Sequence, residues 1–179
     1  MASRSASRRL GMRLAYILVG LALVLAQLLP LEFTPRRWSG PDFLVVLTIA
    51  WAARRPNYVP ALSVAGMILL ADLVLLRPPG VMAALLLVAC ELLRRQAPML
   101  RDTTFMIEWL TAAAAFVGIG LLNRLVLAVF LVDQAPLGLT VTQIFMNVLV
   151  YPLVVGLSYF LLGLHKIAPG DDDAIAGTA

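Results

Sequence analysis

Six polar side chains lie inside or beside long apolar stretches of this sequence, where water would be scarce. One carboxylate and two guanidinium groups could form ion pairs there, and two amides and a phenol could complete a hydrogen-bonded cluster. Transferring a charged group into an apolar medium costs free energy, so each such group is expected to have a bonding partner or a functional role. The six groups are Asp72, Arg77, Arg124, Gln143, Asn147 and Tyr151.

The spacing of these residues predicts that they meet at one depth of a helical bundle. Asp72 precedes the end of its apolar stretch by about 6 Å of helix, and Arg124 precedes the end of its own by about 10 Å, at a rise of 1.5 Å per residue. Gln143, Asn147 and Tyr151 recur every four residues and therefore share one helix face. We predict that Asp72 pairs with Arg124, and that Gln143 and Asn147 satisfy the remaining donors and acceptors.

Arg77 is the alternative partner for Asp72, because it follows five residues later in "GMILLADLVLLRPPG". Three roles remain open for the cluster. It could only fix helix packing, which we favour; it could bind a ligand or an ion; or it could contact a helix of a partner protein. Asp72→Arg combined with Arg124→Asp should restore more folded protein than either single change if these two residues pair.

The composition explains why the cluster would be deprived of water. Hydrophobic residues make up 61% of the 179 residues, charged residues only 13%, and the mean hydropathy is +0.93. Soluble domains are about half apolar and about a quarter charged. Lipid is therefore the expected solvent of much of the chain.

Six apolar stretches predict an all-α integral membrane protein, a six-helix transmembrane bundle within residues 1–165. The second and fourth stretches are short for a span of about 20 residues. The turns "TPRRWSGP", "RRPN" and "RPPG" separate the first four stretches, and residues 166–179 read as a disordered acidic tail. The stretches are 14–29, 43–53, 58–76, 81–93, 108–131 and 139–164.

The distribution of Lys and Arg predicts the orientation, with both termini in the cytoplasm. On that side we count Arg4, Arg8, Arg9, Arg13, Arg54, Arg55, Arg94, Arg95, Arg101 and Lys166. On the opposite side we count Arg36, Arg37 and Arg77. The net charge of +4 thus reflects topology and contact with anionic membrane lipids, and nucleic acid is not an expected partner.

Two other acidic residues have ordinary explanations. Glu91 precedes Arg94 and Arg95 by three and four residues, the spacing of an ion pair on one helix face. Glu108 stands beside Trp109 at the start of the fifth stretch, so we interpret it as an interfacial anchor at a helix N-terminus.

Proline and glycine mark special positions on the last two stretches. Pro152 lies midway along the sixth and predicts a helix kink there. Ala114 with Gly118, and Gly156 with Gly163, form pairs of small residues that predict close helix approach.

The sequence carries no motif of an enzyme. The phosphate-binding loop, the zinc motif H-E-x-x-H and the nucleophile motif G-x-S-x-G are all missing from it. His165 is its single histidine and Cys90 its single cysteine, so a Cys/His metal set and an intramolecular disulfide are excluded. We expect a non-enzymatic protein without a cofactor or metal.

Three motifs resemble those of the MreD family, the rod shape-determining membrane proteins of bacteria. "GPDFLVVLTIAW" is similar to the opening of that family's second span, through Pro41, Asp42, Leu44, Leu47 and Trp51. "GMILLADLVLLRPPG" resembles a glycine–aspartate–glycine segment, through Gly66, Asp72 and Gly80, although Pro79-Gly80 stands where many members have Leu-Gly. "NVLVYPLVVGLSYFLL" is similar to the last helix, through Asn147, Tyr151 and Pro152.

The resemblance implies a role in the bacterial inner membrane. MreD proteins are non-enzymatic, bind MreC and belong to the elongation machinery with RodA, a class B penicillin-binding protein and MreB. Their fold is similar to the substrate-binding subunits of energy-coupling-factor transporters. Two alternatives stay open: a small-solute-binding transporter subunit, and handling of a lipid-linked precursor through Arg36, Arg37 and Trp38.

Overall fold

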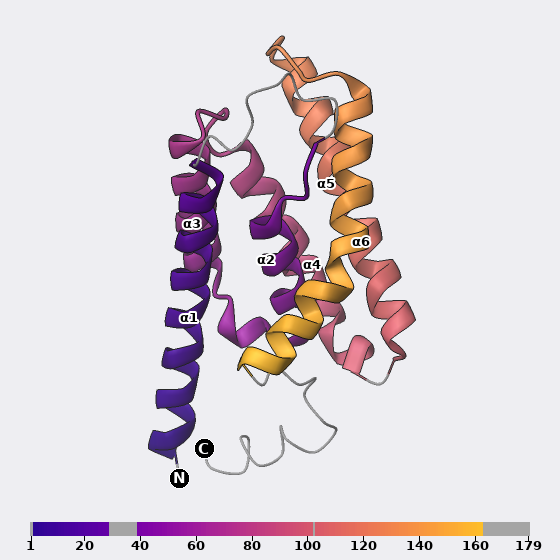
Figure 1. The fold of residues 1–179 in the computed structure, drawn as a ribbon. Helices are drawn as coiled ribbons and strands as arrows, with labels where there is room; N and C mark the ends of the chain where they lie inside the picture. Colours follow the sequence, from indigo (N-terminus) through magenta and orange to yellow (C-terminus); the bar gives the residue numbers. More distant parts are fainter. Residues whose placement is uncertain (1, 29–38, 102, 163–179) are drawn as a thin grey trace.

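The computed structural model describes residues 2–28, 39–101 and 103–162, and all their regular structure is helical (Figure 1). The predicted tail, Arg36, Arg37, Trp38 and residues 163–164 of the sixth predicted span lie outside the described residues. Within these described ranges, six α-helices and one short 3₁₀ helix, η1 (Pro56–Tyr58), follow one another. The α-helices are α1 (Ala2–Leu28), α2 (Phe43–Arg54), α3 (Ala61–Val74), α4 (Val81–Arg101), α5 (Phe105–Val129) and α6 (Leu137–Leu162).

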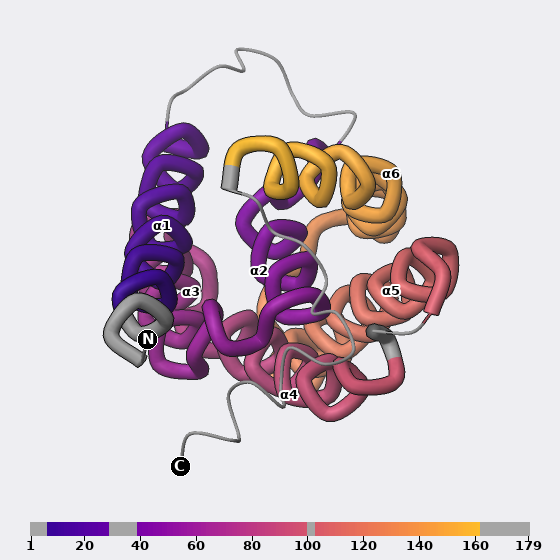
Figure 2. The backbone as a smooth tube through the Cα atoms, turned by 90° about the horizontal axis from the view of Figure 1, so that it is seen from below, coloured from indigo at the N-terminus to yellow at the C-terminus, as the bar shows by residue number. Residues whose placement is uncertain are grey.

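The short helix α2 occupies the middle of the molecule, enclosed by the other helices when viewed along the bundle (Figure 2). Its 12 residues span about 18 Å. Every residue from Leu44 to Ala53 is buried, which suits a helix that is apolar on all sides. Asp42 starts the helix, because its side chain accepts a hydrogen bond from the Val45 N–H at 3.4 Å.

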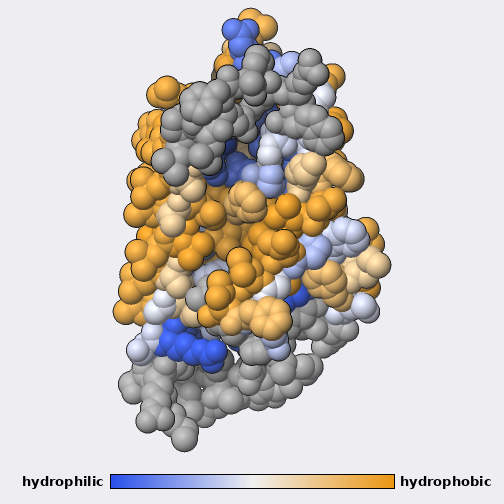
Figure 3. Space-filling model, viewed as in Figure 1, coloured by the Kyte–Doolittle hydropathy of each residue, from blue (hydrophilic) through white to orange (hydrophobic). Residues whose placement is uncertain are grey.

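Successive α-helices run in alternate directions, so the connections after α2 and α4 lie at one end and those after α3 and α5 at the other (Figure 1). Among the residues that the structure describes, three helices are long and apolar enough to cross a membrane: Ser7–Leu28 of α1, Phe105–Val129 of α5, and Leu137–Leu161 of α6. A broad apolar band covers the face seen in Figure 3, with polar residues above and below it. This pattern suits a chain whose middle lies in lipid.

The lengths of the middle helices partly contradict the sequence-based prediction. The second helix is short, as predicted, but the fourth is not: α4 has 21 residues and continues to Arg101. The apolar part of α4 ends near Leu93. The helix continues beyond it because polar residues such as Arg94 and Gln96 are also good helix formers. The other short helix is instead α3, with 14 residues.

The helices α3 and α5 end in the same unusual turn. Leu76 and Leu131 both adopt φ of 53°, a left-handed conformation that glycine usually supplies. The N–H groups of the following residues reach back five positions, from Arg77 to Asp72 O at 2.9 Å and from Val132 to Leu127 O at 3.0 Å. Both leucine side chains are 93% exposed at the same end of the bundle.

Candidate functional site

Asp42 connects three parts of the fold at the start of α2. Its Oδ2 accepts a hydrogen bond from Arg77 Nη1 at 3.1 Å, which brings in the turn between α3 and α4. Its backbone N–H donates to Asn147 Oδ1 of α6 at 2.8 Å. We had not placed Asp42 in the cluster. A helix-capping signal was present in the sequence, since Pro41-Asp42 precede an apolar run.

Asp72 does not form the predicted ion pair with Arg124 or Arg77. It is 1% exposed, and its Oδ2 accepts a hydrogen bond from the Gly80 N–H at 3.2 Å. Within the described residues, its Oδ1 has no hydrogen-bond partner. The Arg77 guanidinium pairs with Asp42 instead, because the turn after α3 carries it over the start of α2.

Arg124 belongs to a different part of the predicted cluster. Its Nη1 donates to the Ala135 carbonyl at 2.9 Å and to Thr140 Oγ1 at 2.8 Å, while its own carbonyl accepts from Gln134 Nε2 at 3.1 Å. These bonds fasten the α5–α6 connection to both helices.

A cavity of about 200 Å³ opens beside Arg124, between α5, α6 and the start of α2. We call it the amide cavity, because four side-chain amides line it. It brings together three predicted site residues, Arg124, Gln143 and Asn147, and it leaves out Asp72, Arg77 and Tyr151. Its polar lining residues are Asp42, Asn123, Arg124, Asp133, Gln134, Thr140, Gln143 and Asn147.

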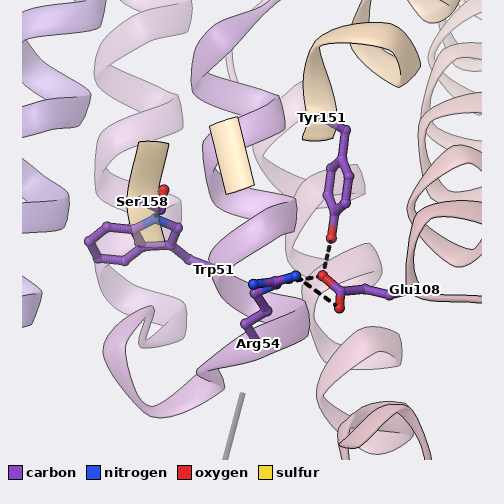
Figure 4. A network of polar contacts seen from close by, with 5 residues as sticks. All are labelled: Trp51, Arg54, Glu108, Tyr151 and Ser158. Atoms are coloured by element: carbon purple, nitrogen blue, oxygen red, sulfur yellow. Dashed lines mark hydrogen bonds and ion pairs between the residues drawn. The ribbon is translucent and has the colours of Figure 1, made fainter. Parts of the chain in front are cut away.

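Tyr151 lies in a second network, shown in Figure 4. Its hydroxyl donates to Glu108 Oε1 at 3.0 Å. Arg54 from the end of α2 holds the same carboxylate with two bonds, Nε to Oε1 at 2.6 Å and Nη2 to Oε2 at 3.3 Å. Glu108 is 1% exposed, so our interpretation of it as an interfacial anchor was wrong. No local pattern could reveal it, since Arg54 is 54 positions away along the chain.

The two other polar groups of α2 also find partners on neighbouring helices. Trp51 Nε1 donates to Ser158 Oγ of α6 at 3.1 Å. Thr48 Oγ1 lies 2.9 Å from the hydroxyl of Tyr16 on α1. The central helix is thus held by polar bonds to α1, α5 and α6 in addition to apolar packing.

Pro152 lies inside α6, and that helix changes direction along its lower half (Figure 1). Proline has no N–H, so the carbonyl of Val148, four residues earlier, loses its helical partner. Trp109 Nε1 donates to that carbonyl at 2.8 Å and replaces the missing bond. The indole of α5 therefore satisfies the backbone where α6 bends.

The remaining predictions concern the ion pair of Glu91 and the close helix approach at small residues. Glu91 pairs with Arg94 and Arg95 at 3.5 and 3.3 Å, as predicted. A side-chain carbon placed on Gly118 or Gly156 would meet nothing within 4 Å, so the predicted close approach is absent there. It occurs instead at Gly120, where such a carbon would lie 2.6 Å from Ile144 Cδ1.

Ala114 and Gly118 line an apolar groove between α4 and α5 rather than a helix contact.

Residues 2–28, 39–101 and 103–162 contain no group of three or more His, Cys, Asp or Glu side chains that could hold a metal ion. The ion pair of Arg54 with Glu108 joins α2 to α5, and the ion pair of Arg77 with Asp42 joins the α3–α4 turn to the start of α2.

Comparison with known proteins gives no relative: no family model, no curated protein and no solved structure matches the chain.

Proposed function

We propose that this protein is a non-enzymatic scaffold of the bacterial inner membrane, similar to MreD, that binds MreC and supports cell-wall elongation with RodA, a class B penicillin-binding protein and MreB. All six α-helices would cross the membrane, with the short helices α2 and α3 shielded by their neighbours. The fold would be similar to energy-coupling-factor substrate-binding subunits.

One observation carries this proposal: the three motifs behind the family resemblance are joined to each other in space. Asp42 of the first motif bonds Asn147 of the third and Arg77 of the second. Trp51 of the first also bonds Ser158 of the third. Motifs that are short and separately weak thus act as one unit, which supports treating their combination as a family signature.

The arrangement of basic residues supports the proposed orientation. Arg13 of α1 donates to the Asn57 carbonyl at 3.3 Å, and Arg94 of α4 donates to the Val59 carbonyl at 3.2 Å. These bonds gather arginines from different helices around the α2–α3 connection, at the end where α1 begins. Such an end suits the cytoplasmic side of a membrane.

The proposal is tested by affinity purification in mild detergent, followed by mass spectrometry of both proteins and small molecules. We expect MreC to co-purify, and we expect depletion of the protein to round a rod-shaped cell. The control is an unrelated tagged membrane protein at matched expression. Failure to recover MreC above this control, together with unchanged cell shape, would refute the scaffold role.

The amide cavity supports a second candidate, a small-solute-binding subunit of a transporter. Its polar lining and its volume of about 200 Å³ would suit a small polar molecule. In the same purification, an energising ATPase and a bound small molecule, recovered without MreC, would establish this candidate in place of the scaffold.

A further inference from the structure

Arg124 lies between two spaces of opposite character. On one side is the amide cavity, and on the other is an open groove on the outer surface of α5, which we call the leucine groove. Arg124, Asp133 and Gln134 line both spaces, so the two spaces adjoin each other at these residues. The leucine groove is lined by Leu121, Arg124, Leu125, Ala128, Val132, Asp133, Gln134 and Leu137.

The guanidinium has capacity for an anionic ligand. In the part of the chain that the structure describes, Arg124 donates from its side chain through Nη1 alone, to Ala135 and Thr140. Nε and Nη2 therefore remain to bind the oxygens of a phosphate, which guanidinium groups hold through two parallel bonds.

The amide cavity offers further donors and acceptors for a polar group attached to that phosphate. Gln143 and Asn123 line it, and neither side chain has a hydrogen-bond partner among the described residues. The volume of the cavity is about 200 Å³. This is enough for a small head group and too little for a whole lipid.

The leucine groove is suited to hydrocarbon. Leu121, Leu125 and Leu137 are each about three-fifths exposed, at 59%, 60% and 64%. They lie beside Arg124 on two of the helices that are apolar enough to cross a membrane. An amphiphile could place its charged group at Arg124 and its chains on these leucines without leaving the lipid.

We propose that Arg124 binds the phosphate of a membrane lipid, with the polar head group in the amide cavity and the acyl chains along the leucine groove. A soluble phosphate compound has the same anionic chemistry, but it would leave the exposed leucines unused. Two carboxylates must be tolerated. Asp42 is neutralised by Arg77, and Asp133 is exposed in the connection between α5 and α6, from which its carboxylate can turn toward the water at the membrane surface.

This inference rests on the proposed membrane location and does not require MreC. The test is native mass spectrometry of the full chain in mild detergent with three added compounds. They are dimyristoyl phosphatidylglycerol, dimyristoyl glycerol without phosphate, and glycerol 3-phosphate without chains. We expect the phospholipid to bind at least about tenfold more tightly than either fragment, because both the phosphate and the chains contribute.

Three variants assign the binding to this site. Arg124→Gln should weaken phospholipid binding at least about tenfold, since a hydrogen bond to a charged group is worth that much or more. Gln143→Leu should weaken it as well while leaving the Arg124 bonds intact, so it serves if Arg124→Gln folds poorly. Arg95→Gln should change nothing, because that side chain is 75% exposed at the opposite end.

Several results would overturn the inference. If glycerol 3-phosphate binds as tightly as the phospholipid, the site binds soluble anions. If dimyristoyl glycerol binds as tightly as the phospholipid, the binding is nonspecific hydrophobic contact. An equal loss in Arg95→Gln and Arg124→Gln would indicate nonspecific attraction. Recovery of the protein outside the membrane fraction would instead refute the proposed location.

Discussion

Replacing Arg54 by methionine should be among the most damaging single changes in this protein. Methionine keeps the length of the apolar stem but removes both bonds to Glu108, whose side chain is 1% exposed. A buried charge left without its partner costs about 3 to 5 kcal/mol. The Tyr151 hydroxyl still donates to Glu108 Oε1, so we expect a loss near the lower value, about 3 kcal/mol.

The reverse change should cost less. Glu108→Gln leaves the Arg54 guanidinium without its counter-charge, but that side chain is 14% exposed at the basic end and can move toward solvent. We therefore expect about 2 kcal/mol, from hydrogen bonds to a charged group that are only partly replaced. The double variant Arg54→Met with Glu108→Gln should lose less than the sum of the two single losses, since no buried charge remains.

Arg95→Met provides the matched control, because Arg95 also pairs with a glutamate, Glu91, but the two side chains are 75% and 49% exposed. A pair of this kind is worth about 0 to 1 kcal/mol. The assay is the free energy of unfolding, obtained by titrating sodium dodecyl sulfate into dodecyl maltoside micelles and following tryptophan fluorescence. If Arg54→Met costs no more than Arg95→Met, burial does not set the strength of the pair and the reasoning is wrong.

Three further predictions can be checked in the same assay. Asp42→Asn keeps a helix cap and loses only the ion pair with the partly exposed Arg77, so it should cost under about 1 kcal/mol. Asp42→Ala also removes the cap and should cost about 1 kcal/mol more. Equal losses in the two variants would contradict the capping role. Leu131→Gly should stabilise the protein by about 0.5 to 1 kcal/mol. The strain of leucine at φ of 53° outweighs the extra backbone entropy that glycine loses on folding. A loss of stability in this variant would disprove the strain. Trp109→Phe removes the hydrogen bond to the Val148 carbonyl and should cost about 1 to 2 kcal/mol. Trp109→Phe should cost less in a Pro152→Ala background, because alanine restores the N–H that proline lacks. An unchanged cost in that background would show that the indole does not replace the missing N–H.

The helical architecture was largely predictable, because it depends on local properties of the chain. Apolar stretches separated by proline and glycine located all six α-helices, although α4 was predicted to be too short. That error has a simple cause: hydropathy reports where lipid could surround a helix, while helix formation also continues through polar residues such as Arg94 and Gln96.

The candidate site was predictable only in part. Depth along the helices placed Arg124, Gln143 and Asn147 at one level of the bundle, and all three line the amide cavity. It gave Asp72 the wrong partner, because depth does not say which helices are neighbours.

The sequence by itself determined the helical class of the described residues, the approximate position of each α-helix, and which residues are unusual for an apolar environment. Only the tertiary structure decided which acid meets which base. Arg77 pairs with Asp42 across 35 positions, and Asn147 reaches the same residue across 105. Hydrophobic periodicity acts within one helix, whereas these pairs depend on the lateral order of helices around α2, which is set by side-chain packing over the whole bundle.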